Sequence, residues 1–169
     1  MAAPVPLDPV PALCLKAPDQ SGAFFMSDTG DRRNFYGRIR GKTLRASQKD
    51  YLAEDLGPLT LRGVTRDENP TRTPLDLGFV KGPLWLEVGF GGGEHLVHMA
   101  AANPQVTIIG AEPFVNGIAM LLGKIRGAGV QNLWLHPGDV RDLFDVVPDA
   151  CLTKVFVNYP DPWPKARHH

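Results

Sequence analysis

The sequence has few cysteines and no excess of charge of either sign. Cys14 and Cys151 are the two cysteines among 169 residues, and they lie far apart in dissimilar contexts. They fit neither a disulfide framework nor the spacing of zinc ligands, so we expect a reducing, cytoplasmic location and no metal site. The 18 basic side chains balance the 18 acidic ones. Net charge therefore neither favours nor excludes a polyanionic partner, and the distribution of charge has to decide.

Long apolar runs are also absent. Nowhere does the sequence hold the roughly 18 consecutive apolar residues that a transmembrane helix needs, so we expect no membrane partner. The first residues lack a basic stretch followed by an apolar one, which argues against a signal peptide. Residues 1–30 are rich in proline and alanine, a composition that predicts a flexible tail. The remaining length is enough for one domain with a hydrophobic core.

One glycine-rich stretch organises the rest of the sequence. Residues 84–88 are apolar and β-favouring apart from Glu87, and the apolar spacing that starts at Leu96 is typical of a helix. Gly89, Gly91 and Gly93 lie between them. Glycine permits positive φ and a close approach of the backbone to a ligand, and the helix that follows directs free N–H groups into the turn. The stretch therefore predicts a strand, a ligand-binding turn and a helix; a glycine connection without a ligand is the alternative.

Glu87 indicates which ligand the turn would bind. A carboxylate at the strand end would repel a pyrophosphate but attract a cationic amine. S-adenosylmethionine carries an amine and a sulfonium and has no phosphate. The pattern Glu-x-Gly-x-Gly-x-Gly after a strand therefore resembles motif I of the class I methyltransferases, whereas an NAD-dependent oxidoreductase is disfavoured. A solvent-exposed carboxylate is the other reading of Glu87.

The second half of the sequence alternates between strand and helix patterns. This alternation predicts an α/β fold, a doubly wound and mostly parallel sheet with helices on both faces, and a ligand site beyond the carboxyl ends of the strands. The expected strands are 84–88, 106–111, 133–136 and 154–158, and the expected helices are 94–102, 114–128 and 140–144.

Two acidic residues follow the second and third expected strands. Glu112 is placed to accept hydrogen bonds from both hydroxyls of a ribose, which suits NAD as well as S-adenosylmethionine. It also suits a simple role as an acid at a helix N-terminus. Asp139 is placed to accept from an adenine amino group, with Val140 donating its backbone N–H and packing on the ring. An N-cap role for Asp139 is the alternative, and both roles can hold together.

Basic residues cluster in one segment. Residues 32–49 hold seven of the 18 basic residues, Arg38, Arg40 and Lys42 among them, and no acidic residue. Basic clustering with interleaved aromatics indicates a nucleic-acid contact, although a solvated arm is the alternative. Ser47 is expected to cap a helix over 48–56 that Gly57-Pro58 ends, and 60–77 is expected to be a loop. We thus expect three parts: a tail over 1–30, a basic segment over 31–80 and a ligand-binding domain over 81–169.

The last expected strand leads into Tyr-Pro-Asp-Pro-Trp-Pro-Lys-Ala-Arg-His-His at 159–169. Three prolines in five positions exclude helix and strand, so we expect a stiff loop at the same sheet edge. The loop resembles the F-P-D-P-W-x-K-x-R-H signature of the tRNA (guanine-N7-)-methyltransferases, with Tyr159 in place of Phe. Residues 35–45 are similar to that family's Y-G-R-x-x-G-x-x-L segment, and the resemblance spans about 32–169.

This resemblance implies a Rossmann-like fold, S-adenosylmethionine as cofactor and a guanosine in the tRNA variable loop as target, methylated at N7. By the same resemblance, Glu87, Glu112 and Asp139 would bind the cofactor. Asp161 would be catalytic and border the cofactor, and Lys165 would contact tRNA. We add Arg167 and the basic segment as further phosphate contacts.

Members of that family continue past this loop, so the C-terminal strands of the sheet are expected to be missing from this chain. A non-catalytic RNA-binding remnant therefore remains as an alternative. A methyltransferase for another substrate is a second alternative, because Asn158-Tyr159-Pro160 is faintly similar to the N-P-P-Y loop of amino-group methyltransferases. The sequence does not distinguish a monomer from a homodimer.

Overall fold

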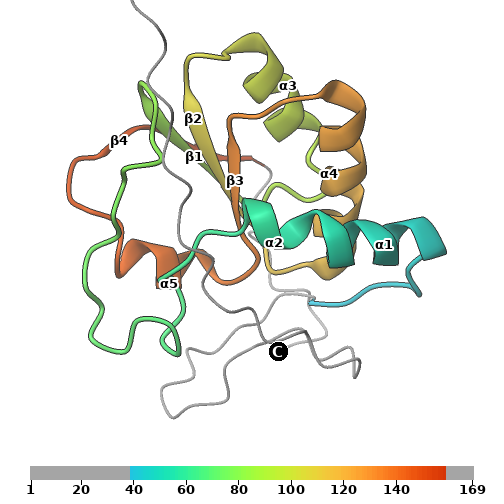
Figure 1. The fold of residues 1–169 in the computed structure, drawn as a ribbon, viewed down its shortest axis with the longest axis horizontal. Coiled ribbons are helices and arrows are strands. Elements are labelled where there is room, and N and C mark those ends of the chain that lie inside the picture. Colours follow the sequence, from blue (N-terminus) through green and yellow to red (C-terminus); the bar gives the residue numbers. More distant parts are fainter. Residues whose placement is uncertain (1–38, 159–169) are drawn as a thin grey trace, which may run out of the picture.

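The computed structural model of the chain describes residues 39–158, which form an α/β fold (Figure 1). Arg38 and the predicted site residues Asp161, Lys165 and Arg167 lie outside the described residues. Their predicted roles therefore stay predictions. The elements in chain order are α1 Ala46–Glu54, α2 Leu56–Leu59, β1 Leu84–Val88, α3 Glu94–Ala102, β2 Thr107–Ala111, α4 Val115–Ala128, β3 Leu133–His136, α5 Val140–Phe144 and β4 Leu152–Val157.

The four strands form a parallel sheet in the order β3-β2-β1-β4. The chain builds β1, β2 and β3 in one direction and then returns to place β4 on the other side of β1. Glu87 pairs with Gly110 of β2 and with Phe156 of β4. The point where the strand order reverses lies between β1 and β4, and ligands in such sheets bind at that point beyond the carboxyl ends. The predicted α/β, mostly parallel fold is confirmed.

Alternate residues of the strands serve two separate cores. Trp85 and Ile108 point to the face covered by α1, α3 and α4. Leu86 and Ile109 point to the other face, where α5 and the segment 61–80 cover them (Figure 1). Because both faces of β1, β2 and β3 are covered, these strands are mostly buried and apolar, whereas β4 at the edge is largely exposed. Each large side chain buried in this way contributes about 1.5–3 kcal/mol to folding.

The helices before the sheet differ from the prediction. Helix α1 begins at Ala46 with Arg45 as its N-cap, so the predicted cap at Ser47 is wrong. The Gln48 side chain accepts from the Arg45 backbone N–H at 3.0 Å and closes the start of the helix. Gly57-Pro58 does not end this helix but lies inside the single-turn α2. Proline is tolerated there because the first turn of a helix needs no internal N–H bond.

Helix α1 packs along α4 through an aromatic ring and a set of ion pairs. The Tyr51 ring lies over Gly123, where an added Cβ would be 3.0 Å from the ring. Arg126 of α4 lies 5.0 Å from the Tyr51 ring centroid and pairs with Glu54 and Asp55 at 2.6 Å each. These contacts attach the segment before the sheet to the helix that follows β2. Within 39–158, no helix is both long and apolar enough to cross a bilayer.

Candidate functional site at the carboxyl edge of the sheet

The turn between β1 and α3 is built from glycines in a left-handed conformation. Gly91 and Gly93 have φ of 55° and 78°, values that side-chain-bearing residues rarely adopt. A Cβ on Gly93 would lie 2.5 Å from Leu121 of α4. On the other side of the turn, a Cβ on Gly117 would lie 2.2 Å from the Gly91 carbonyl oxygen. Backbone conformation and close packing on α4 together require glycine here.

The carboxylate of Glu87 is buried at the end of β1, with 2 % of the residue exposed. Its Oε2 accepts a hydrogen bond from His95 Nδ1 at 2.9 Å, and Asn158 Nδ2 lies 3.5 Å from Oε1. Within residues 39–158, no lysine or arginine pairs with Glu87. A buried carboxylate whose neighbours are a histidine and an amide has attraction left for an organic cation.

Glu112 connects the glycine turn to the start of α4. This residue is 7 % exposed. Its Oε2 accepts from the Gly91 N–H at 2.8 Å, and its Oε1 accepts from the Phe114 N–H at 2.9 Å. A carboxylate has about four acceptor positions, so each oxygen keeps one for a ligand hydroxyl. The alternative reading, an exposed acid at the helix N-terminus, is wrong because the residue is buried and makes no cap bond to α4. Its bonds to the turn and to Phe114 are compatible with a ligand role.

Asp139 is the N-cap of α5, which confirms one of the two roles predicted for it. Its Oδ1 accepts from the Arg141 N–H at 2.9 Å, and its Oδ2 pairs with the Arg141 guanidinium. This pairing raises the pKa of Arg141. Val140 opens α5 beside it. Asp139 is thus held in place at the end of β3, where the predicted adenine contact would be.

His136, a buried histidine beside Asp139, was not identified from the sequence. His136 ends β3, is 3 % exposed and donates from Nε2 to the Asp139 carbonyl oxygen at 3.0 Å. A Cβ at position 138 would lie 2.8 Å from that nitrogen, so Gly138 makes room for the ring. Burial lowers the pKa of His136 below its ordinary value, so at neutral pH the ring is uncharged.

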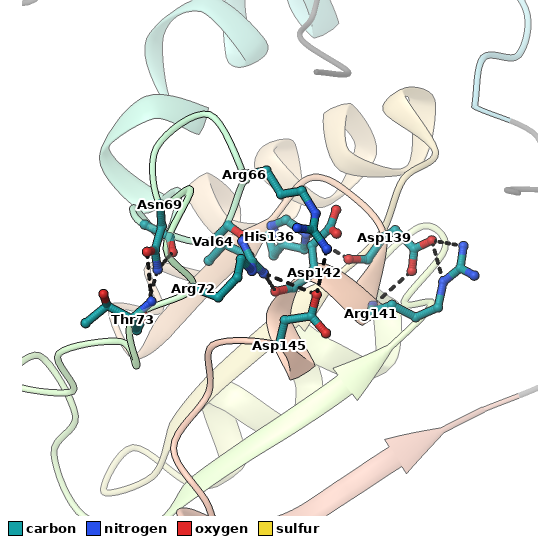
Figure 2. A network of polar contacts seen from close by, with 11 residues as sticks. Val64, Arg66, Asn69, Arg72, Thr73, His136, Asp139, Arg141, Asp142 and Asp145 are labelled. Atoms are coloured by element: carbon teal, nitrogen blue, oxygen red, sulfur yellow. Dashed lines mark hydrogen bonds and ion pairs between the residues drawn. The ribbon is translucent and has the colours of Figure 1, made fainter. Parts of the chain in front are cut away.

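A polar network joins the loop after α2 to α5 on the same side of the sheet. Figure 2 shows Arg72 reaching from the loop toward Asp142 and Asp145. Its guanidinium donates to the carbonyl oxygens of Val64 and Asp142 and lies 3.6 Å from the Asp145 carboxylate. The network holds the loop against the segment that carries Asp139. Neither His136 nor Arg72 belongs to a recognisable motif, so no sequence signal could have identified them.

His95 could have been identified from the sequence. It is the second residue of α3, directly after the glycine turn, so its side chain starts next to the strand end that carries Glu87. Its ring also lies 5.3 Å from the Phe156 ring of β4. The structure therefore adds His95 and Asn158 to the predicted set around Glu87.

The predicted substrate residues Arg40 and Lys42 are exposed and lie beside the start of α4. The structure thus brings part of the basic segment near Glu112, whose Oε1 accepts from the backbone N–H of Phe114, the N-cap residue of that helix. Among residues 39–158, no group of three or more histidine, cysteine or acidic side chains has the arrangement of a metal site. Cys151 is a free thiol in this part of the chain, and burial raises its pKa.

Comparisons with known proteins identify the family of this chain. A family profile described as "Putative methyltransferase" matches residues 81–169. A tRNA (guanine-N(7)-)-methyltransferase of Cereibacter sphaeroides is 71% identical over 139 residues, which cover 81% of this chain and 58% of that protein. The protein of the same name from Paracoccus denitrificans is 67% identical over 141 residues, covering 82% of this chain and 60% of that relative.

A third relative extends the match toward the N-terminus. The tRNA (guanine-N(7)-)-methyltransferase of Ruegeria sp. is 54% identical over 160 residues, which cover 94% of this chain and 62% of that protein. The chain thus spans about three fifths of the length of the relatives it matches. Because the family profile covers more than half of the sequence, the chain belongs to this putative methyltransferase family.

Proposed function

We propose that the chain binds S-adenosylmethionine at the carboxyl edge of its sheet and methylates N7 of a guanine in the variable loop of tRNA. The observation that carries the proposal is the pair of buried carboxylates, Glu87 and Glu112, on either side of the glycine turn. The relatives named as tRNA (guanine-N(7)-)-methyltransferases support the substrate.

The residues present fit this cofactor better than a dinucleotide. Glu87 offers a buried negative charge to the α-amino group, and Glu112 offers two acceptor positions to the ribose hydroxyls. Asp139 and Val140 lie where an adenine would extend past β3. The Glu87 carboxylate at the turn would repel a pyrophosphate, which disfavours NAD, whereas Glu112 suits the ribose of either cofactor.

The proposed chemistry makes modest demands on the protein. When bound, S-adenosylmethionine supplies a methyl group on a sulfonium, which is already activated for transfer. Guanine N7 has a lone pair and no proton, so it needs no general base. That lone pair forms the new N–C bond, and the electron pair of the breaking C–S bond stays on sulfur.

The task of the chain is then to align the two reactants, and alignment alone can supply roughly 7–11 kcal/mol. The guanine ring gains positive charge during transfer. We propose that Asp161 stabilises that charge and orients the base, and that Lys165, Arg167, Arg38, Arg40 and Lys42 contact phosphates.

A labelled-methyl assay on bulk tRNA tests the proposal. We expect incorporation of label that appears as 7-methylguanosine after nuclease digestion. Calorimetry with S-adenosylhomocysteine and with NAD accompanies the assay, and binding of the first without the second is expected. Label in another nucleoside would overturn the N7 assignment. Binding of tRNA without transfer would instead favour the RNA-binding alternative.

A further inference from the structure

The side chain of Asn116, the second residue of α4, attaches the basic segment to the sheet domain. Its Oδ1 accepts from the Gly41 N–H at 2.7 Å, and its Nδ2 donates to the Lys42 carbonyl oxygen at 2.7 Å. One amide thus satisfies a donor and an acceptor of adjacent residues in a segment more than 70 positions away in the sequence. Both bonds are exposed and compete with water, so the neighbouring contacts matter.

Two such contacts lie beside the Asn116 amide. The backbone N–H of Val115 donates to the Ile39 carbonyl oxygen at 2.9 Å, and this bond satisfies one of the free donors at the start of α4. Gly41 lies against the Phe114 ring, where an added Cβ would be 2.9 Å from the ring edge. Residues 39–42 are therefore held at three consecutive positions, the N-cap residue Phe114 and the first two residues of α4, Val115 and Asn116.

The N-cap and first turn of α4 also contact the candidate cofactor turn. Phe114 donates its N–H to Glu112, and Gly117 lies against the Gly91 carbonyl. The start of α4 thus contacts both the basic segment and the glycine turn. The positions of Arg40 and Lys42 relative to the turn are therefore set by Asn116 and its neighbours.

We infer that Asn116 is a positioning residue for the RNA substrate: it fixes residues 39–42 so that Arg40 and Lys42 contact phosphates while the target base reaches the methyl group. This inference rests on the proposed function. A neutral amide is suited to the task. It provides both a donor and an acceptor without a negative charge, which would repel phosphates at this surface.

Asn116→Ala is the first test. We expect the KM for tRNA to rise about five- to tenfold with kcat little changed, because contacts that position the RNA are lost and the reacting groups remain. The slope of log affinity against log salt should decrease in magnitude by about 1–2, since two phosphate contacts weaken. Affinity for S-adenosylhomocysteine should stay as in the wild type.

Asn116→Asp separates positioning from a structural role. Aspartate keeps the acceptor for Gly41 but loses the donor to Lys42, and its charge interacts favourably with the N-terminus of α4. If Asn116 only stabilised the helix, this variant would keep its Tm and would lose tRNA affinity only through the added charge, so its deficit relative to the wild type would disappear at high salt. We expect instead an unchanged or higher Tm together with tRNA affinity at least as weak as that of Asn116→Ala, with a deficit that persists at high salt.

Gly41→Ala perturbs the same contact from the other partner. The added methyl group meets Phe114 and Asn116, so we expect the tRNA affinity to decrease as it does in Asn116→Ala. Because both changes break one contact, the double variant should be little worse than either single variant. Full additivity of the two effects would contradict the inference.

Asn132→Ala provides a matched control. The Asn132 amide donates to the carbonyl oxygens of Ala100, Asn103 and Val106, all remote from the carboxyl edge. This variant should lose stability and keep the wild-type salt slope. A change of slope equal to that of Asn116→Ala would assign the effect to general destabilisation.

Amide hydrogen exchange at Gly41 gives a readout that needs no RNA. Exchange at Gly41 should be faster in Asn116→Ala than in the wild type, and unchanged exchange would overturn the inference. If the wild-type chain binds no tRNA, the proposed function fails and this inference fails with it. If the wild type binds tRNA and Asn116→Ala binds it equally well with the same salt slope, only this inference fails.

Discussion

The carboxylate of Glu112 accepts a hydrogen bond from the Gly91 backbone N–H at 2.8 Å. Its second oxygen accepts from the Phe114 N–H at 2.9 Å. One side chain at the end of β2 therefore fixes both the turn after β1 and the start of α4. The predicted ribose contact and this structural role share the same two oxygens, so a substitution there should change binding and stability together.

Glu112→Gln is expected to weaken both properties. An amide has one oxygen, so its NH2 group must face one of the two N–H donors that the carboxylate now satisfies. We expect a loss of about 1–3 kcal/mol in the free energy of unfolding and at least a tenfold weaker affinity for S-adenosylhomocysteine. Urea unfolding and calorimetry measure the two effects.

The matched control for Glu112→Gln is Glu94→Gln. The Glu94 side chain is 70% exposed and pairs with Lys124 on the surface. This control should change stability by less than about 1 kcal/mol and leave binding intact. Unchanged ligand affinity in Glu112→Gln would contradict the ribose assignment.

Glu87→Gln should separate binding from stability. Glutamine keeps an acceptor for His95 and removes a buried charge that has no lysine or arginine partner within the described residues. The free energy of unfolding should therefore change by less than about 1 kcal/mol, or increase. Affinity for S-adenosylhomocysteine should fall about 10- to 100-fold, because the ammonium loses its counter-charge. Equal affinities in calorimetry would show that Glu87 does not bind the amine.

The fold could largely be predicted because glycine and proline delimit apolar runs in this sequence. The strands at Leu84–Val88 and Leu133–His136 match the expected ranges, as does the helix at Glu94–Ala102. Glu87 and Glu112 were predictable because strand ends of a parallel sheet share one edge. The start of α1 was predicted wrongly, because Arg45 is the N-cap without any cap bond from its side chain, and Gln48 instead accepts from the Arg45 N–H.

The long-range contacts around the candidate site could not be predicted from the sequence. The Asn116 side chain bonds to Lys42, which is 74 positions away in the sequence, and the Arg72 side chain bonds to Asp142, which is 70 positions away. Each of these side chains bonds to a backbone carbonyl oxygen, which every residue type provides. No residue pattern at either end indicates such a pair, so only the folded chain identifies it.

Arg72→Lys is expected to destabilise the loop after α2. The Arg72 side chain is 15% exposed and reaches three acceptors, on Val64, Asp142 and Asp145. A lysine ammonium lacks the planar fork and cannot reach all three. We expect a loss of about 2 kcal/mol in urea unfolding.

Arg62→Lys is the control for this loop variant, since the Arg62 side chain is 65% exposed and pairs with Glu68 on the surface. Its cost should be below about 0.5 kcal/mol. Equal stabilities of the two variants would show that the Arg72 network contributes nothing to folding.

His136 should make stability depend on pH in the acidic range. Burial lowers the folded-state pKa of His136 below the ordinary 6.5. In mildly acidic solution the unfolded chain therefore binds a proton at this position that the folded chain does not bind. Stability is therefore complete above pH 6.5 and decreases as pH falls toward the folded pKa, by up to about 1.4 kcal/mol per pH unit.

His136→Gln removes the titrating group, so wild type should lose more stability than this variant between pH 7.5 and 5.5 in urea unfolding. His98→Gln, a change at an exposed position of α3, should keep the wild-type slope, and identical slopes in all three proteins would contradict the assignment to His136.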